Sequence, residues 1–141
     1  MQRINGPLNQ SLAMDNLVIN EKEARHFFQW KKANKKVSVY YQDQLLASSS
    51  KTILLKEVGR EIYDGVYYFP KEDVQMELFK ESDTSTFCPI KGEAAYYSLG
   101  AEKDLAWYYP EPIKRSKIIE DRLAFYANKV KFIIEPLAEK E

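Results

Sequence analysis

The residues best suited to chemistry gather in one short segment of this chain, residues 82–97, which reads SDTSTFCPIKGEAAYY. Cys88 precedes Pro89, whose ring fixes φ and removes a backbone donor, and Lys91 and Gly92 follow. A thiol beside a cation can become a nucleophile because the cation favours the thiolate. If the chain catalyses a reaction, we therefore predict Cys88 and Lys91 as its catalytic residues.

Both residues also have a structural interpretation. A lone cysteine at the end of a strand is more often a small buried apolar side chain than a nucleophile. Lys91 lies between two aromatic-rich strands, where a lysine can bind an anion, stack on a ring or act as an amine. Its alternatives are a solvated turn residue and a structural ion pair with Asp73 or Glu93.

Tyrosine is frequent, with ten in 141 residues. Aromatic clusters are most often core, but each buried tyrosine hydroxyl needs a hydrogen-bond partner, which favours a polar-lined cavity over a dry interior. We predict a pocket that binds a small molecule of unidentified class, lined by Tyr68, Asp73, Lys91, Tyr97, Trp107 and Tyr109.

Several common sites are missing from the sequence. It has no glycine-rich phosphate loop, no nucleophile elbow and no H-E-x-x-H motif. No D-x-D pair occurs, and Asp73, Glu77 and Asp83 could meet only through folding, which disfavours metal-dependent nucleotidyl transfer. His26 and Cys88 are the only histidine and cysteine and lie far apart in sequence, so we predict no metal site and no cofactor.

The charge balance is even, with 21 basic and 21 acidic residues, so no broad field attracts nucleic acid or an anionic membrane. No apolar run is long enough for a signal peptide or a membrane span. We expect a cytoplasmic protein without nucleic-acid or membrane partners. The alternative to a small-molecule site is a non-catalytic interaction module, or a homodimer formed through the aromatic face.

The elements that must position these residues are mainly β-strands. From Val37 onward, short runs alternate apolar and polar residues between brief turns, which predicts a single compact domain of antiparallel sheets over residues 37–136. Residues 1–36 are predicted as an N-terminal extension and residues 137–141 as a polar tail. Asn20 followed by Glu23 resembles a capping box, which predicts one helix over residues 20–34.

Four motifs occur in a recognisable order: VYYFPKEDVQMELF, TSTFCPIKGEAAYYS, DLAWYYPEP and LAFYANKV. Together they resemble the family catalogued as domain of unknown function 427, also labelled nucleotidyltransferase-like, over about residues 37–135. The resemblance implies a compact antiparallel β domain of the tent-like type. The family's shared residues fall here on Tyr68, Pro70, Asp73, Cys88, Pro89, Lys91, Gly92, Tyr97, Trp107, Tyr109, Pro110 and Tyr126.

Overall fold

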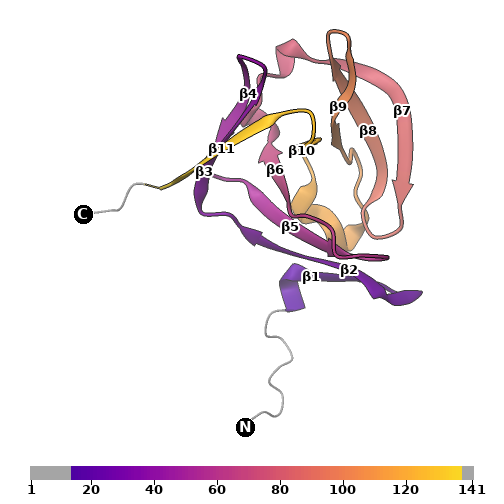
Figure 1. The fold of residues 1–141 in the computed structure, drawn as a ribbon. Helices are drawn as coiled ribbons and strands as arrows, with labels where there is room; N and C mark the ends of the chain where they lie inside the picture. The colour runs from indigo at the N-terminus through magenta and orange to yellow at the C-terminus, as the bar shows by residue number, and fades with distance from the viewer. Residues whose placement is uncertain (1–13, 138–141) are drawn as a thin grey trace.

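The computed structural model describes residues 14–137, and antiparallel strands make up most of this part of the chain (Figure 1). The strands are β1 Leu17–Asn20, β2 Glu23–Lys32, β3 Lys35–Tyr41, β4 Gln44–Ser49, β5 Ile53–Val58, β6 Val66–Pro70, β7 Lys80–Cys88, β8 Gly92–Leu99, β9 Glu102–Tyr108, β10 Arg122–Phe125 and β11 Lys131–Pro136. Short 3₁₀ turns lie between them, namely η1 Met14–Asn16, η2 Lys71–Asp73, η3 Met76–Leu78 and η4 Lys114–Ile119.

The strands form two sheets. Eight of them pair in the order β1-β2-β5-β6-β10-β9-β8-β7, and three pair in the order β11-β3-β4. Every pairing is antiparallel. The predicted mainly β domain is therefore confirmed. No helix within residues 14–137 has the length and apolar character needed to cross a membrane.

The predicted helix over residues 20–34 is wrong, because this segment forms β1, a turn and β2. Asn20 caps a turn, since its side-chain oxygen accepts the Lys22 N–H at 2.9 Å. β2 pairs with β5 from Phe27 opposite Val58 onward, and Phe28 is fully buried. These long-range hydrogen bonds and this burial outweigh the helix propensity of the local sequence.

The interior has two apolar clusters. The first, which we call the site-side core, includes Phe28, Leu55, Tyr68, Ile90, Tyr96 and Tyr109. The second core includes Val39, Leu46, Phe69, Leu105, Leu123 and Phe125. Successive side chains of a strand point to opposite faces, so the neighbours Tyr96 and Tyr97 on β8 pack against different clusters.

Segments from opposite halves of the eight-stranded sheet come close together. The Arg115 guanidinium, on η4, donates a hydrogen bond to the Ile19 carbonyl of β1 at 2.7 Å. Figure 1 shows the turn between β7 and β8 beside the ends of β2 and β5. Residues from β2, β5 and the β7–β8 turn, which are distant in sequence, therefore meet at one place.

Candidate functional site

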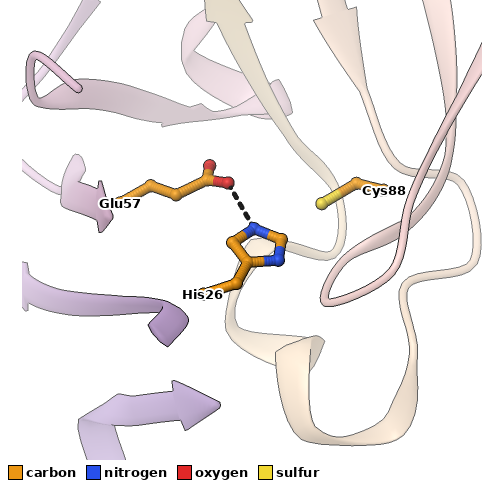
Figure 2. A group of neighbouring side chains, drawn as sticks. All are labelled: His26, Glu57 and Cys88. Atoms are coloured by element: carbon orange, nitrogen blue, oxygen red, sulfur yellow. Dashed lines mark hydrogen bonds and ion pairs between the residues drawn. The ribbon is translucent and has the colours of Figure 1, made fainter. Parts of the chain in front are cut away.

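Three side chains that carry chemistry converge where the end of β7 meets β2 and β5. One ligand atom from each of His26, Glu57 and Cys88 lies within 4.8 Å of the others (Figure 2). His26 comes from β2, Glu57 from the neighbouring β5, and Cys88 is the last residue of β7. The sequence analysis placed His26 far from Cys88, and folding brings the two together.

Glu57 is the centre of this cluster, because both its oxygens are engaged. Lys91 Nζ donates to Oε1 at 2.6 Å, and His26 Nε2 lies 2.8 Å from Oε2. Burial raises the pKa of Glu57, but the Lys91 ammonium and the His26 hydrogen bond outweigh it and lower the pKa overall. Glu57 is therefore a carboxylate at neutral pH.

Lys91 points inward from the turn that connects β7 and β8. The side chain is buried, and Nζ lies 5.8 Å from the ring centre of Phe28 and 5.9 Å from that of Tyr109. Burial lowers the pKa of Lys91, but Tyr109 and the hydrogen-bonded Glu57 carboxylate raise it overall. Lys91 is thus a charged, buried lysine paired with Glu57, and neither a solvated turn residue nor a partner of Asp73 or Glu93.

The backbone around Lys91 holds it in this position. Its N–H donates to the Cys88 carbonyl at 3.1 Å, and its carbonyl accepts the Ile113 N–H at 2.9 Å. Gly92 has a φ of +120°, and a Cβ there would lie 3.2 Å from the Glu111 carbonyl oxygen. The glycine therefore permits a turn that another residue would strain.

The hydrogen bonds around His26 define its tautomer. Asn20 Nδ2 lies 3.2 Å from His26 Nδ1, and Asn20 Oδ1 already accepts the Lys22 N–H. The amide nitrogen can only donate, so Nδ1 of His26 accepts, and Nε2 carries the hydrogen that Glu57 receives. The imidazole is thus oriented by partners on both sides.

Cys88 is a free, half-buried thiol beside this network. Its charge in the thiolate form would raise the pKa values of Lys91, Tyr68 and Tyr109, so all four groups are electrostatically connected. Among the described residues, Cys88 Sγ takes part in no hydrogen bond to His26 or Glu57. The thiol is thus near the acid–base pair and uncommitted.

The Tyr68 hydroxyl is a buried polar group without a partner among the described residues. The ring packs edge-on against Trp107 with centroids 6.5 Å apart. Burial raises the pKa values of Tyr68 and Tyr109 far above their usual range, so both hydroxyls keep their protons. A buried hydroxyl without a partner is destabilising.

Four of the six residues predicted to line the pocket lie close together, and the other two lie elsewhere in the fold. Tyr68, Lys91, Trp107 and Tyr109 lie with Cys88 around the site-side core. Asp73 instead accepts a 2.6 Å hydrogen bond from Ser49, and Tyr97 stacks on Tyr108 beside the second core.

The sequence analysis missed Glu57 and did not assign His26 to the site, although a signal for both exists. On β5, Ile53 and Leu55 face inward, and Glu57 continues the same alternation. On β2, His26 shares the inward face of Phe28. Reading both segments as strands would have placed an acid and an imidazole on buried faces.

A cavity of about 740 Å³ opens beside the cluster. His26 forms part of its wall, and so does Pro89, which follows Cys88 directly. The other lining residues are Glu23, Arg25, Gly59, Arg60 and Tyr63. The acid–base cluster is therefore next to a space that a small molecule can enter.

His26, Glu57 and Cys88 are also residue types that bind zinc, and they would leave a coordination position open. Lys91 already neutralises the carboxylate, however, and both imidazole nitrogens are hydrogen-bonded. A cation would have to displace these partners. Asp73, Glu77 and Asp83 form no such group within residues 14–137. The arrangement therefore disfavours metal binding.

Comparison with known proteins identifies the chain at the level of a family. No curated protein matches it. The family model described as domain of unknown function (DUF427) matches residues 29–136, which cover β3 to β11 and include Glu57, Cys88 and Lys91. On this match over most of its length, the chain belongs to the DUF427 family.

Proposed function

We propose that this protein binds a small polar molecule over the cluster of His26, Glu57, Cys88 and Lys91, and reacts with it through the Cys88 thiol. The observation that carries the proposal is the convergence of a thiol, an imidazole and a carboxylate within 4.8 Å, beside a cavity of about 740 Å³. Reactive groups with interacting charges in a cleft are typical of catalytic sites.

Each member of the cluster has a distinct role in this proposal. Lys91 keeps Glu57 ionised, and Glu57 in turn orients His26. When the thiol attacks a carbonyl carbon, a sulfur–carbon bond forms and the C=O π bond breaks, with its electron pair going to oxygen. The S–H bond breaks as well, and its proton passes to Nδ1 of His26, the ring nitrogen that bears no hydrogen, in place of the Asn20 hydrogen bond.

The buried tyrosines complete the site. The Tyr68 hydroxyl keeps its proton, is buried behind the cavity lining and has no partner among the described residues. In this proposal it donates to an oxygen of the bound molecule that extends inward from the cavity. A donor that is already buried and oriented needs little reorganisation when charge develops on that oxygen. This use would explain why the fold tolerates an unpaired hydroxyl there.

The proposal can be tested by alkylating the protein with iodoacetamide, since Cys88 is the only cysteine. We expect the native thiol to react at a rate that does not change with low concentrations of urea. His26→Gln should slow the reaction, while Lys56→Gln, an exposed change elsewhere on β5, should not. A rate that rises with urea in parallel with global unfolding would identify Cys88 as an inert core residue and reject the proposal.

The interaction module remains a second candidate because two large apolar side chains are strongly exposed. Phe87 on β7 is 73% exposed, and Ile62, in the loop after β5, is 81% exposed. Such residues are enriched where proteins associate. This candidate predicts a dimer in sedimentation velocity that Phe87→Ser converts to a monomer. A wild-type monomer at high concentration would reject dimerisation.

A further inference from the structure

We infer that the ligand carries an acidic group, a carboxylate or a phosphate, and that Arg60 binds it at the outer wall of the cavity. This inference rests on the proposed function, because it concerns the molecule that reaches Cys88. It follows from the charges that line the cavity and from which of them already have partners.

Arg25 and Glu23, both on the cavity wall, neutralise each other. Arg25 Nε lies 3.0 Å from Glu23 Oε2, and Arg25 Nη2 lies 3.2 Å from Oε1. The Arg25 N–H also donates to this carboxylate at 3.1 Å. A paired guanidinium and carboxylate contribute little net charge to the cavity.

The cluster next to the cavity likewise presents no free negative charge. Glu57 is engaged by Lys91 on one oxygen and by His26 on the other. An anion entering from the cavity would therefore not meet an uncompensated carboxylate at the cluster.

Arg60 is the lining residue whose charge remains available. It is exposed, and the ion pairs among the described residues do not include it. Its loop is fixed close to the site, because the Gly59 N–H donates to the Glu61 carbonyl at 2.9 Å and the Tyr63 N–H donates to the Glu57 carbonyl at 3.0 Å. A guanidinium on such a loop suits bidentate recognition of a carboxylate or phosphate.

Two aromatic rings flank Gly59, which precedes Arg60 in the cavity lining. A Cβ placed on Gly59 would lie 3.4 Å from His26 Cδ2 and 3.5 Å from Tyr63 Cε2. Without a side chain at Gly59, the body of a ligand can lie between the imidazole and the tyrosine ring. An acidic group on Arg60 would then leave the other end of the ligand directed toward the cluster.

The charge surrounding the cavity agrees with this assignment. A neighbouring hollow shares Pro89 with the cavity, and its charged lining residues are Glu21, Lys22, Lys114 and Arg115. These four side chains sum to +2 in a chain with no net charge, so the neighbouring hollow carries a local excess of positive charge. Such an excess raises the local concentration of anions.

The inference can be tested with a matched pair of thiol reagents, N-propylmaleimide and 3-maleimidopropionate, which differ in a carboxylate. In each reaction the S–H bond and the C=C π bond break, sulfur bonds to one alkene carbon, and a proton is added to the neighbouring carbon. Rates in the native protein are divided by rates in the urea-unfolded protein, which removes the intrinsic difference between reagents. We expect the anionic reagent to be favoured about two- to fivefold, the scale of an exposed ion pair.

Arg60→Gln should abolish this preference. Lys56→Gln removes the same charge from β5, but Lys56 lines a different hollow, so it should preserve the preference. Equal effects of the two variants, or no preference in the wild type, would overturn the inference while leaving the reactivity of Cys88 intact. Inorganic phosphate and acetate are then added as competitors. If phosphate suppresses the preference more strongly than acetate, the acidic group is a phosphate; if acetate suppresses it more strongly, the acidic group is a carboxylate.

A second measurement does not depend on the thiol. In the Cys88→Ser variant, inorganic phosphate and acetate are titrated while the Arg60 Nε–Hε resonance is followed by NMR. A saturable shift with at least one anion, absent for Arg25, supports the inference even if the native thiol does not react with iodoacetamide. No shift with either anion would overturn it.

Discussion

The ion pair between Glu57 and Lys91 can be tested by removing one partner at a time. Glu57→Gln preserves the shape of the side chain and leaves the Lys91 ammonium, 9% exposed, without its carboxylate. Removing one partner of a fully buried pair costs about 3–5 kcal/mol. Glu57 keeps 20% of its side-chain exposure, so water screens part of this loss. We expect the free energy of unfolding to fall by about 2–3 kcal/mol.

The assay is urea denaturation at pH 7 of the wild type, Glu57→Gln, Lys91→Met and the double variant. The double variant should recover much of the loss, because it buries no unpaired charge. Glu23→Gln is the control, since that carboxylate forms an exposed pair with Arg25 and should not affect stability measurably. Additive losses, or a Glu57→Gln variant within about 0.5 kcal/mol of the wild type, would refute the reasoning.

The pH dependence of this difference has a defined sign. Folding lowers the pKa of Glu57, so the carboxylate contributes to the free energy of unfolding above its ordinary pKa of 4.5. This contribution is lost as pH falls through the folded pKa. Folding raises the pKa of Lys91, so the ammonium contributes to the free energy of unfolding below its ordinary pKa of 10.5. This contribution is lost as pH rises through the folded pKa. The stability difference between wild type and Glu57→Gln should therefore be largest between these limits.

Two further predictions concern the same site. Tyr68→Phe removes a buried hydroxyl that has no partner among the described residues, so urea denaturation should show a free energy of unfolding that is unchanged or higher by up to about 1 kcal/mol. Cys88 should react more slowly with iodoacetamide in this variant. A clear loss of stability would show that the hydroxyl has a structural partner. Zinc should not co-purify in stoichiometric amount, because Lys91 already neutralises Glu57; one zinc per chain by elemental analysis, lost in Cys88→Ala, would contradict this.

Much of the fold could be predicted from the sequence because period-2 alternation is a direct consequence of strand geometry. The paired strands β3 and β4 show this, with Val37 and Val39 inward and turn residues between the strands. The segment from Asn20 to Asn34 was wrongly predicted as a helix, because the residue types that cap helices are also common in turns between strands. Asn34 has a positive φ of 55°, which is common for an asparagine just after a helix, but here it follows strand β2.

The candidate site could be predicted only in part, for a physical reason. Cys88 and Lys91 are close in sequence, and the local turn shows their proximity. Their partners His26 and Glu57 reach them through long-range pairing of β2 with β5 and closure of the eight-stranded sheet, which a local pattern does not specify. Asp73 and Lys91 fit one pocket by residue type, but the fold places Asp73 beside Ser49.

The central claim is that the cluster of His26, Glu57, Cys88 and Lys91 is where this protein binds its ligand. The most direct measurement combines a thermal-shift screen of metabolites with alkylation of Cys88 by iodoacetamide. Binding to the folded state raises the melting temperature. We predict that a metabolite that does so also protects Cys88 from alkylation in the native protein, and that Lys91→Met removes both effects. A metabolite that stabilises the protein while Cys88 reacts at an unchanged rate would contradict the claim.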